Sequence, residues 1–274
     1  MRTRAAPLAA ALLFAILVSL AACSGSPRKT VRAATAKTTD AGSAHVVITG
    51  STTSGGQSFT VTGEGDFDFE KLVGAGTFDL SDLPVAAGGT LGDEGVGELI
   101  FDGSTFYMNL PFLSRLSPDI EDWVRFDTAE LGGRSNQIAQ LGQNDPSQAL
   151  SYLNGATEIT KRADEDVAGV STTRYDLTID YREGFQEAPE GLRPAYDSII
   201  DDLDIEEAPG SVWIDEQGFI RRMSYEWTFE PGSATGETTQ NVALEFSDYG
   251  DRVEVELPPE DEVTDFEELL RRGP

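Results

Sequence analysis

The fold is decided by two neighbouring stretches of the chain, QSFTVTGEGDFDF at residues 57–69 and LVGAGTFDL at residues 72–80. Both alternate apolar or glycine positions with polar ones, a pattern typical of antiparallel strands that bury one face. Glycines on a buried face bend a sheet and leave space beneath it, or mark a simple bulge, and the pattern leaves both interpretations open. The glycines that share the face of the phenylalanines are Gly63, Gly65, Gly74 and Gly76.

The same alternation continues along the chain and is interrupted by two helical patterns. The first helix is expected around residues 145–155, where Asp145-Pro146 supplies an N-cap and a first helical residue. The second is expected at residues 190–206, where apolar residues recur along one helical face. We therefore predict one α+β domain over residues 45–259, formed by a large curved antiparallel sheet with two helices inserted. An acidic tail over residues 260–274 follows, which is either a helical turn or a frayed end.

Composition excludes several classes of protein. The 274 residues carry 20 Lys and Arg against 48 Asp and Glu, for a formal net charge of −28, with one Cys and one His. Such an acidic surface repels phosphate backbones, so nucleic acid is not an expected partner. One Cys and one His cannot build a zinc cage, and no disulfide can form within the chain.

The N-terminus predicts export and a lipid anchor. Arg2 and Arg4 precede an uncharged, mostly apolar run from Leu8 to Leu20, the layout of a signal peptide over residues 1–22. This run is shorter than the roughly 18 apolar residues of a membrane span. The following Leu20-Ala21-Ala22-Cys23 resembles the lipobox of bacterial lipoproteins, which implies cleavage before Cys23 and diacylglycerol on its sulfur. The alternative is an ordinary secreted protein with a chance cysteine.

Charge is sorted along the predicted mature chain. Residues 23–44 contain Arg28, Lys29, Arg32 and Lys37 against Asp40 alone. From His45 onward, 14 Lys and Arg face 47 Asp and Glu, a net charge of −33. We expect a basic tether close to an anionic membrane and an acidic body repelled from it. The tether itself is either a short, weakly apolar helix or a disordered linker.

No catalytic signature is present, and we expect neither enzymatic activity nor a cofactor. The sequence contains no nucleophile elbow, phosphate-binding loop or zinc-protease motif. We assign His45, at the entry to the first strand, a structural role, and the many carboxylate pairs are expected by chance among 48 acids. The acidic residues at 201–207 lack calcium-loop spacing, so we expect a solvated helix end and no metal site.

Strand aromatics and aliphatics are the remaining candidates for function. Most belong to an ordinary core, but cavities for apolar ligands are lined by the same residue types. The candidates for lining a ligand cavity are Phe59, Val61, Phe67, Phe78, Tyr175, Leu177, Ile179, Met223, Tyr225, Trp227, Ile199 and Leu203.

Four segments together resemble the actinobacterial lipoprotein family typified by LppX and LprG, which also includes LprA and LprF. They are the lipobox start, DPSQALSYL (145–153), ADEDVAGVSTTRYDLTIDY (163–181) and VWIDEQGFIRRMSYEW (212–227). The resemblance implies a LolA-like fold, in which a strongly curved antiparallel half-barrel sheet has helices covering its concave side over an apolar cavity. It also implies that acylated lipids or lipoglycans are bound and carried within the cell envelope.

Taken together, these observations predict a monomeric, non-enzymatic lipoprotein on the extracytoplasmic face of the cell membrane. Its expected partners are the plasma membrane, through the acyl chains on Cys23, and an acylated lipid or glycolipid; an envelope transporter is a further candidate. The alternative function is a surface interaction or sensor module with a filled core. A third possibility, an envelope hydrolase, would need two carboxylates in contrasting environments.

Overall fold

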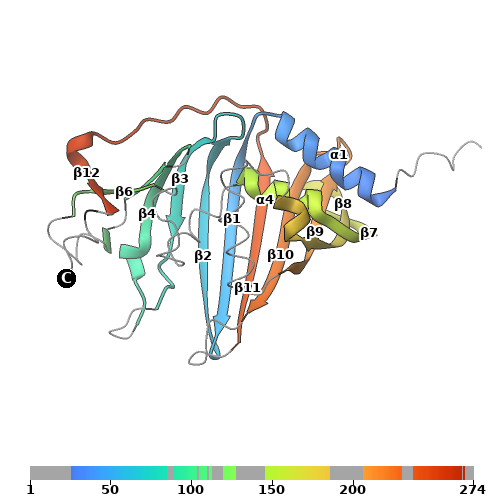
Figure 1. Cartoon of the computed structure of the whole chain (residues 1–274), viewed down its shortest axis with the longest axis horizontal. Coiled ribbons are helices and arrows are strands. Elements are labelled where there is room, and N and C mark those ends of the chain that lie inside the picture. The colour runs from blue at the N-terminus through green and yellow to red at the C-terminus, as the bar shows by residue number, and fades with distance from the viewer. Residues whose placement is uncertain are drawn as a thin grey trace, which may run out of the picture.

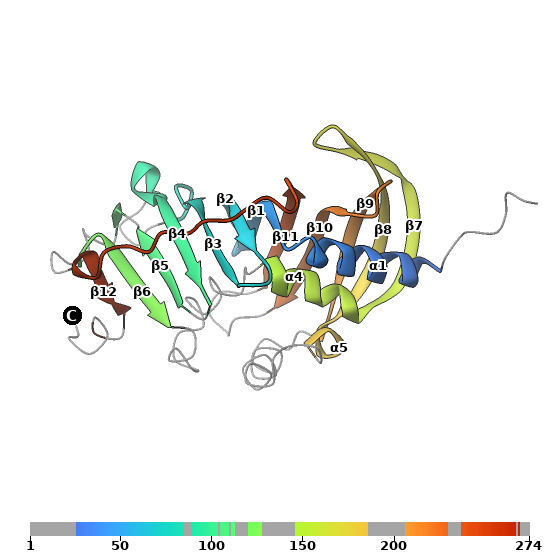
Figure 2. The same ribbon diagram turned by 90° about the horizontal axis from the view of Figure 1, so that it is seen from above.

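The computed structural model describes residues 26–84, 89–103, 105–109, 111–112, 120–127, 146–185, 206–229, 237–266 and 268. Its dominant element is one open sheet of twelve strands, with a few helices lying over part of one face (Figures 1 and 2). The α+β class predicted from the sequence is thereby confirmed. The strands are β1 Ser43–Ser54, β2 Gln57–Asp68, β3 Val73–Asp79, β4 Val96–Asp102, β5 Thr105–Asn109, β6 Trp123–Asp127, β7 Ala156–Val167, β8 Val170–Asp180, β9 Glu207–Asp215, β10 Ile220–Phe229, β11 Thr238–Ser247 and β12 Val263–Asp265.

The strand order is β12-β6-β5-β4-β3-β2-β1-β11-β10-β9-β8-β7, so the first and eleventh strands meet at the centre of the sheet. Neighbours pair antiparallel throughout, except that β12 pairs parallel with β6, Val263 lying opposite Trp123. The expectation of a purely antiparallel sheet is therefore wrong at this edge. Part of the predicted acidic tail supplies the additional strand.

The described helices are α1 Pro27–Asp40, α4 Pro146–Tyr152 and α5 Tyr181–Phe185, with 3-10 turns η1 Gly92–Gly95, η2 Leu153–Gly155 and η3 Glu260–Glu262. The helix expected around residues 145–155 is confirmed as α4 and η2, with Pro146 as its first residue. The helix expected at residues 190–206 and the N-cap Asp145 lie outside the described residues.

Helix α1 is packed on the sheet, so the alternative of a disordered linker is wrong for its residues. Val31, Ala34 and Thr38 are buried on its inner side, and the helix contacts β7, β9 and β10. The Ile220 backbone amide donates a hydrogen bond of 3.0 Å to the Thr38 hydroxyl. The Lys37 ammonium lies 4.3 Å from the centre of the Phe219 ring. These contacts fix α1 to the turn between β9 and β10.

Two apolar cores lie on the sheet. The first core lies between α1, α4 and strands β7–β11 and extends to Ala44, Val46 and Phe67 on β1 and β2. The second core lies at the other end, among Phe78, Phe106, Met108, Val124 and Phe126 of strands β3–β6. Phe101 on β4 packs against both cores.

Candidate functional site: an apolar sheet face with a glycine strip

Strand register aligns the predicted cavity residues that lie on described strands on one face of the sheet. Tyr225 lies opposite Val242, Val242 opposite Gly50, and Gly50 opposite Val61. The parallel row runs from Met223 through Leu244 and Ile48 to Gly63 and Phe78. Since side chains in one transverse row point to the same side, a single apolar face extends from β10 to β3.

Six of the twelve predicted residues lie in the first core, where they are closed off from solvent. Met223 and Ile179 are fully buried, and Trp227 packs against the core from a half-buried position. The Tyr225 ring stacks on Trp227 at 5.2 Å, and burial raises the pKa of the Tyr225 phenol far above its usual range. The other predicted members of this core are Phe67, Tyr175 and Leu177.

The remaining predicted residues are placed differently. Phe78 belongs to the second core, Val61 packs against it from a half-buried position, and Phe59 is half-buried in neither core. Ile199, Leu203 and the predicted lipidation site Cys23 lie outside the described residues. A role in lining a ligand cavity stays a prediction for all twelve residues.

Between the two cores the same face is only half-buried and is unusually poor in side chains. We call these positions the glycine strip. It consists of Ile48, Gly50, Phe59, Val61, Gly63, Gly65, Gly76, Gly97, Leu99 and Phe101 on strands β1 to β4. Every one of them has intermediate exposure, in contrast to the buried residues on either side.

Some glycines of the strip are required by close backbone contacts. A Cβ on Gly76 would lie 2.2 Å from the Glu64 carbonyl oxygen and 2.8 Å from the Gly65 Cα. A Cβ on Gly97 would lie 2.2 Å from the Asn109 carbonyl oxygen. Because β2 pairs with β3, and β3 with β4, without any register shift, the interpretation of these glycines as bulges is wrong.

Two other glycines of the strip have room above them. A Cβ on Gly63 would be 3.4 Å from the Thr77 carbonyl oxygen and 3.9 Å from the Phe78 Cβ. A Cβ on Gly50 would meet only the Val61 carbonyl oxygen, at 3.9 Å. These are ordinary contact distances, so the absence of a side chain at Gly50 and Gly63 is not imposed by the backbone and leaves apolar surface uncovered.

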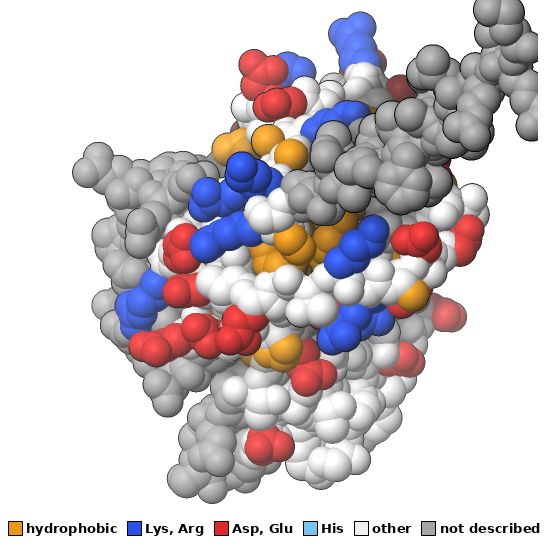
Figure 3. Space-filling model, turned by 90° about the vertical axis from the view of Figure 1, so that its right-hand side faces the viewer, with side chains coloured by type: hydrophobic (Ala, Val, Ile, Leu, Met, Phe, Trp, Pro, Cys, Tyr) orange, Lys and Arg blue, Asp and Glu red, His pale blue; other side chains and the backbone are white. Residues whose placement is uncertain are grey.

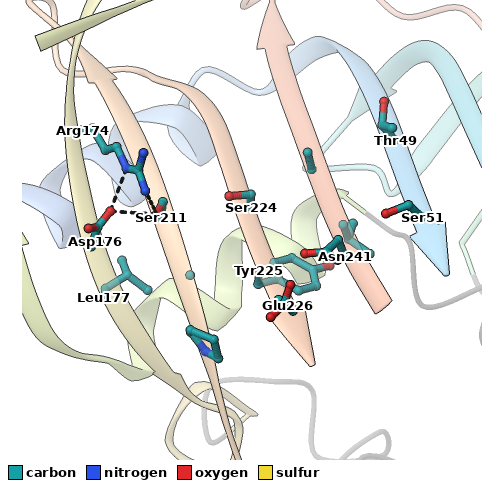
Figure 4. Close-up of a pocket in the computed structure, with 14 residues that line it drawn as sticks. Thr49, Ser51, Arg174, Asp176, Leu177, Ser211, Ser224, Tyr225, Glu226 and Asn241 are labelled. Carbon is teal, nitrogen blue, oxygen red and sulfur yellow. Dashed lines mark hydrogen bonds and ion pairs between the residues drawn. The ribbon is translucent and has the colours of Figure 1, made fainter. Parts of the chain in front are cut away.

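The opposite face of the sheet carries a polar hollow of about 570 Å³ that the sequence analysis did not predict (Figure 4). One wall of the hollow is formed by Arg174 and Asp176 on β8 and Ser211 on β9, which are hydrogen-bonded to one another. The Arg174 Nε donates to Asp176 Oδ1 at 2.7 Å, and the Ser211 hydroxyl donates to the same oxygen at 2.9 Å. Thr49, Ser51, Ser224 and Asn241 line the side towards β1.

Asp176 is held charged by this network. Burial alone would raise the pKa of its carboxyl, but hydrogen bonds from Arg162, Arg174 and Ser211 outweigh burial and lower the pKa below its usual value. The charged groups Arg174 and Asp176 are paired with each other and with Ser211, and the rest of the lining mixes hydroxyl and amide groups with apolar residues such as Leu177 and Ala243. The hollow therefore offers hydrogen bonds to a polar ligand.

The structure describes some of the residues considered for chemistry, and others lie outside the described ranges. The His45 Nδ1 lies 2.8 Å from Asp66 Oδ1 on the neighbouring strand, at the polar face of the sheet. Within the described ranges, no three His, Cys, Asp or Glu side chains gather as metal ligands would. The acidic residues at 201–207 are described only from Glu206 onward. None of the described helices is both long and apolar enough to cross a bilayer.

Comparison with known proteins finds relatives among bacterial lipoproteins. No protein-family model matches the chain. An uncharacterised 31.2 kDa protein of Streptomyces griseus is 26% identical over 202 residues, which cover 68% of this chain and 64% of that protein. A Streptomyces coelicolor protein described as a lipoprotein is 26% identical over 153 residues, covering 54% of this chain and 44% of that protein. The matches thus span less than two thirds of either relative.

Among solved structures, the lipoprotein LppX of Mycobacterium tuberculosis matches with 18% identity and a TM-score of 0.49, over 84% of this chain and 98% of LppX. The chain is thus similar to actinobacterial lipoproteins of the LppX type, the resemblance that its sequence indicated.

Proposed function

We propose that this chain is a non-enzymatic lipoprotein, anchored through Cys23 to the outer face of the cell membrane, that carries an acylated lipid or glycolipid. The acyl chain lies along the glycine strip, on the face that α1 and α4 cover at the first core. The single observation that carries the proposal is the interruption of one apolar sheet face by a half-buried strip between two closed cores.

The strip suits an alkyl chain for two reasons. Its surface is made of aliphatic and aromatic side chains and of glycine backbone, so a bound methylene meets few polar groups. Each methylene buried there contributes about 0.8 kcal/mol, and a chain crossing four strands spaced roughly 4.8 Å apart would bury many. Affinity would then come from acyl burial, and selectivity from groups near the ends of the strip.

The experiment uses the chain from Ser26 onward, which keeps every described element because α1 begins at Pro27. Native mass spectrometry of this protein, purified without detergent from a bacterial host, would show bound lipid. The variant Gly63→Leu adds a side chain to the strip at ordinary contact distances. Displacing two methylenes costs about 1.6 kcal/mol, so lipid occupancy should fall roughly tenfold.

The matched control is Thr62→Leu, an exposed neighbour on the same strand that points to the opposite face. It should leave occupancy unchanged. Absence of lipid from the unmodified protein, together with equal behaviour of the two variants, would contradict the proposal.

The second candidate function is a protein-interaction or sensor module. It is favoured by one observation, the polar hollow around Arg174 and Asp176 on the face away from the glycine strip. In that case Arg174→Ala would abolish binding of an envelope partner, while Gly63→Leu would leave it intact. Cross-linking in intact cells, followed by identification of the captured protein in the two variants, separates the two functions.

A further inference from the structure

The outer side of helix α1 is basic in a body that is otherwise strongly acidic. Val31, Ala34 and Thr38 face the sheet, so the opposite side of the helix is open to solvent. That side carries Lys29, Arg32 and Lys37, and its only carboxylate is Asp40 at the last residue. Figure 3 views the molecule from the end where α1 begins, and Lys and Arg side chains lie there interspersed with Asp and Glu.

Small residues lie between these cations. Ala33 and Ala36 are both exposed, near the middle of the outer side. They would let a flat partner approach the helix closely along its length, about 21 Å for 14 residues. Three of the cations also contact the protein itself. The Arg28 guanidinium pairs with Glu183 of α5 at 3.0 Å, the Arg32 guanidinium donates to the Asn154 carbonyl oxygen at 3.4 Å, and the Lys37 ammonium donates to the Gln217 carbonyl oxygen. All three side chains remain exposed, so docking would exchange these contacts for lipid headgroups.

We propose that the outer side of α1 docks on the anionic headgroups of the lipid bilayer. The proposal rests on the anchor at Cys23, which is part of the proposed function. Four residue steps separate Cys23 from Pro27, so the helix begins within about 14 Å of the acylated sulfur. This short link lets the outer side of α1 reach the bilayer surface, where each Lys or Arg adds about fivefold to the association.

Docking fixes the orientation of the whole protein. Helix α1 and the glycine strip lie on the same face of the sheet, because the buried side of α1 and the strip belong to one continuous apolar face. When the outer side of α1 lies on the bilayer, this face is turned towards the membrane. The acidic body then extends away from the headgroups, and a lipid can pass between bilayer and strip over a short path.

The test is amine footprinting of the full lipidated chain in protein-free vesicles, either pure phosphatidylcholine or 30% phosphatidylglycerol. Acetylation of each lysine would be followed by mass spectrometry. Lys29 and Lys37 should react at least about fivefold more slowly in the anionic vesicles. A lysine introduced by Ser58→Lys provides the internal reference, since Ser58 is exposed on β2 and lies on the face opposite to the strip.

The variant Ala33→Glu/Ala36→Glu should abolish the difference, because it places two carboxylates between the cations at exposed positions that accept helix formers. Its control, Thr62→Glu/Thr77→Glu, adds the same charge on the exposed side of β2 and β3. In this control the difference in lysine reactivity between the two vesicle types should remain. Thermal melting by circular dichroism would verify that both variants fold.

If Lys29 and Lys37, measured against the lysine introduced by Ser58→Lys, reacted equally in both vesicle types, the docking would be overturned. So would protection that appears only in native envelope vesicles, which would assign this surface to a protein partner. Loss of the chain from vesicles at high salt would instead indicate failure of the anchor at Cys23, so the two failures are distinguishable.

Discussion

Two regions of the sheet, β7–β11 and the glycine strip on β1–β4, use the same strand alternation and reach different packing. In the region formed by β7–β11, large side chains such as Met223 and Leu244 meet α1 and α4, and the apolar face is closed. In β1–β4 the corresponding positions include Gly50, Gly63 and Gly76, and the face is only half-buried. The difference teaches that alternation sets which face is apolar, while side-chain volume decides whether that face is filled.

The largest expected effect is a difference in stability between substitutions at two glycines of the strip, Gly76 and Gly63. Gly76→Val places a Cβ 2.2 Å from the Glu64 carbonyl oxygen, so the paired strands must shift, and we expect a loss of at least about 3 kcal/mol in unfolding free energy. Gly63→Val meets only ordinary contacts and gains β-propensity, so its stability should stay within about 1 kcal/mol of the unmodified protein. Urea unfolding measures both, and similar losses would show that the strip is packed like the cores.

A smaller effect is expected when alanine substitutions in the closed core and in the strip are compared for stability and lipid occupancy. Met223→Ala empties a fully buried position and should cost about 2–5 kcal/mol, without lowering lipid occupancy in the protein that remains folded. Phe59→Ala removes a half-buried ring and should cost about 1 kcal/mol, while occupancy falls. Thermal melts measure the stability of both variants, and native mass spectrometry of the same samples measures their lipid occupancy. If Met223→Ala lowered occupancy and Phe59→Ala did not, the closed core and the strip would not differ in function.

The smallest effect concerns the polar face. The folded pKa of Asp176 lies below its ordinary value of about 3.9, so its charged network stabilises the protein above that pH and the contribution is lost as pH falls through the folded pKa. Asp176→Asn should therefore cost about 1 kcal/mol at pH 7, with the difference shrinking below about pH 4. Asp93→Asn, at an exposed 3-10 turn, is the control for general charge removal. A cost independent of pH would point to packing instead.

Several features could be predicted from the sequence because they depend on local patterns. Alternation over residues 57–80 predicted two strands and the common face of their glycines, and the register places Gly65 opposite Gly76. The Asp102-Gly103 pair is typical of a hairpin turn and forms the turn between β4 and β5, where Gly103 adopts a φ of 64°. Each of these follows from side-chain periodicity or backbone freedom within a few residues.

Other features depend on contacts distant in sequence. Three residues of β12 are too few to show a period, and their parallel pairing with β6 is set by tertiary structure. The inner side of α1 is small and weakly apolar, and its position depends on Ile220, 182 residues from Thr38. The hollow around Asp176 needs the register of β8 and β9, which brings Ser211 beside it.

The most direct test of the central claim is photo-crosslinking with a phospholipid that carries a diazirine in its acyl chain. The unmodified protein would be loaded, irradiated and digested, and the adducts located by mass spectrometry. We expect adducts on strip residues such as Ile48, Phe59 and Leu99, and their loss in Gly63→Leu. Adducts confined to the opposite face, at Thr49, Ser51 or Asn241, or unchanged adducts in Gly63→Leu, would contradict the account.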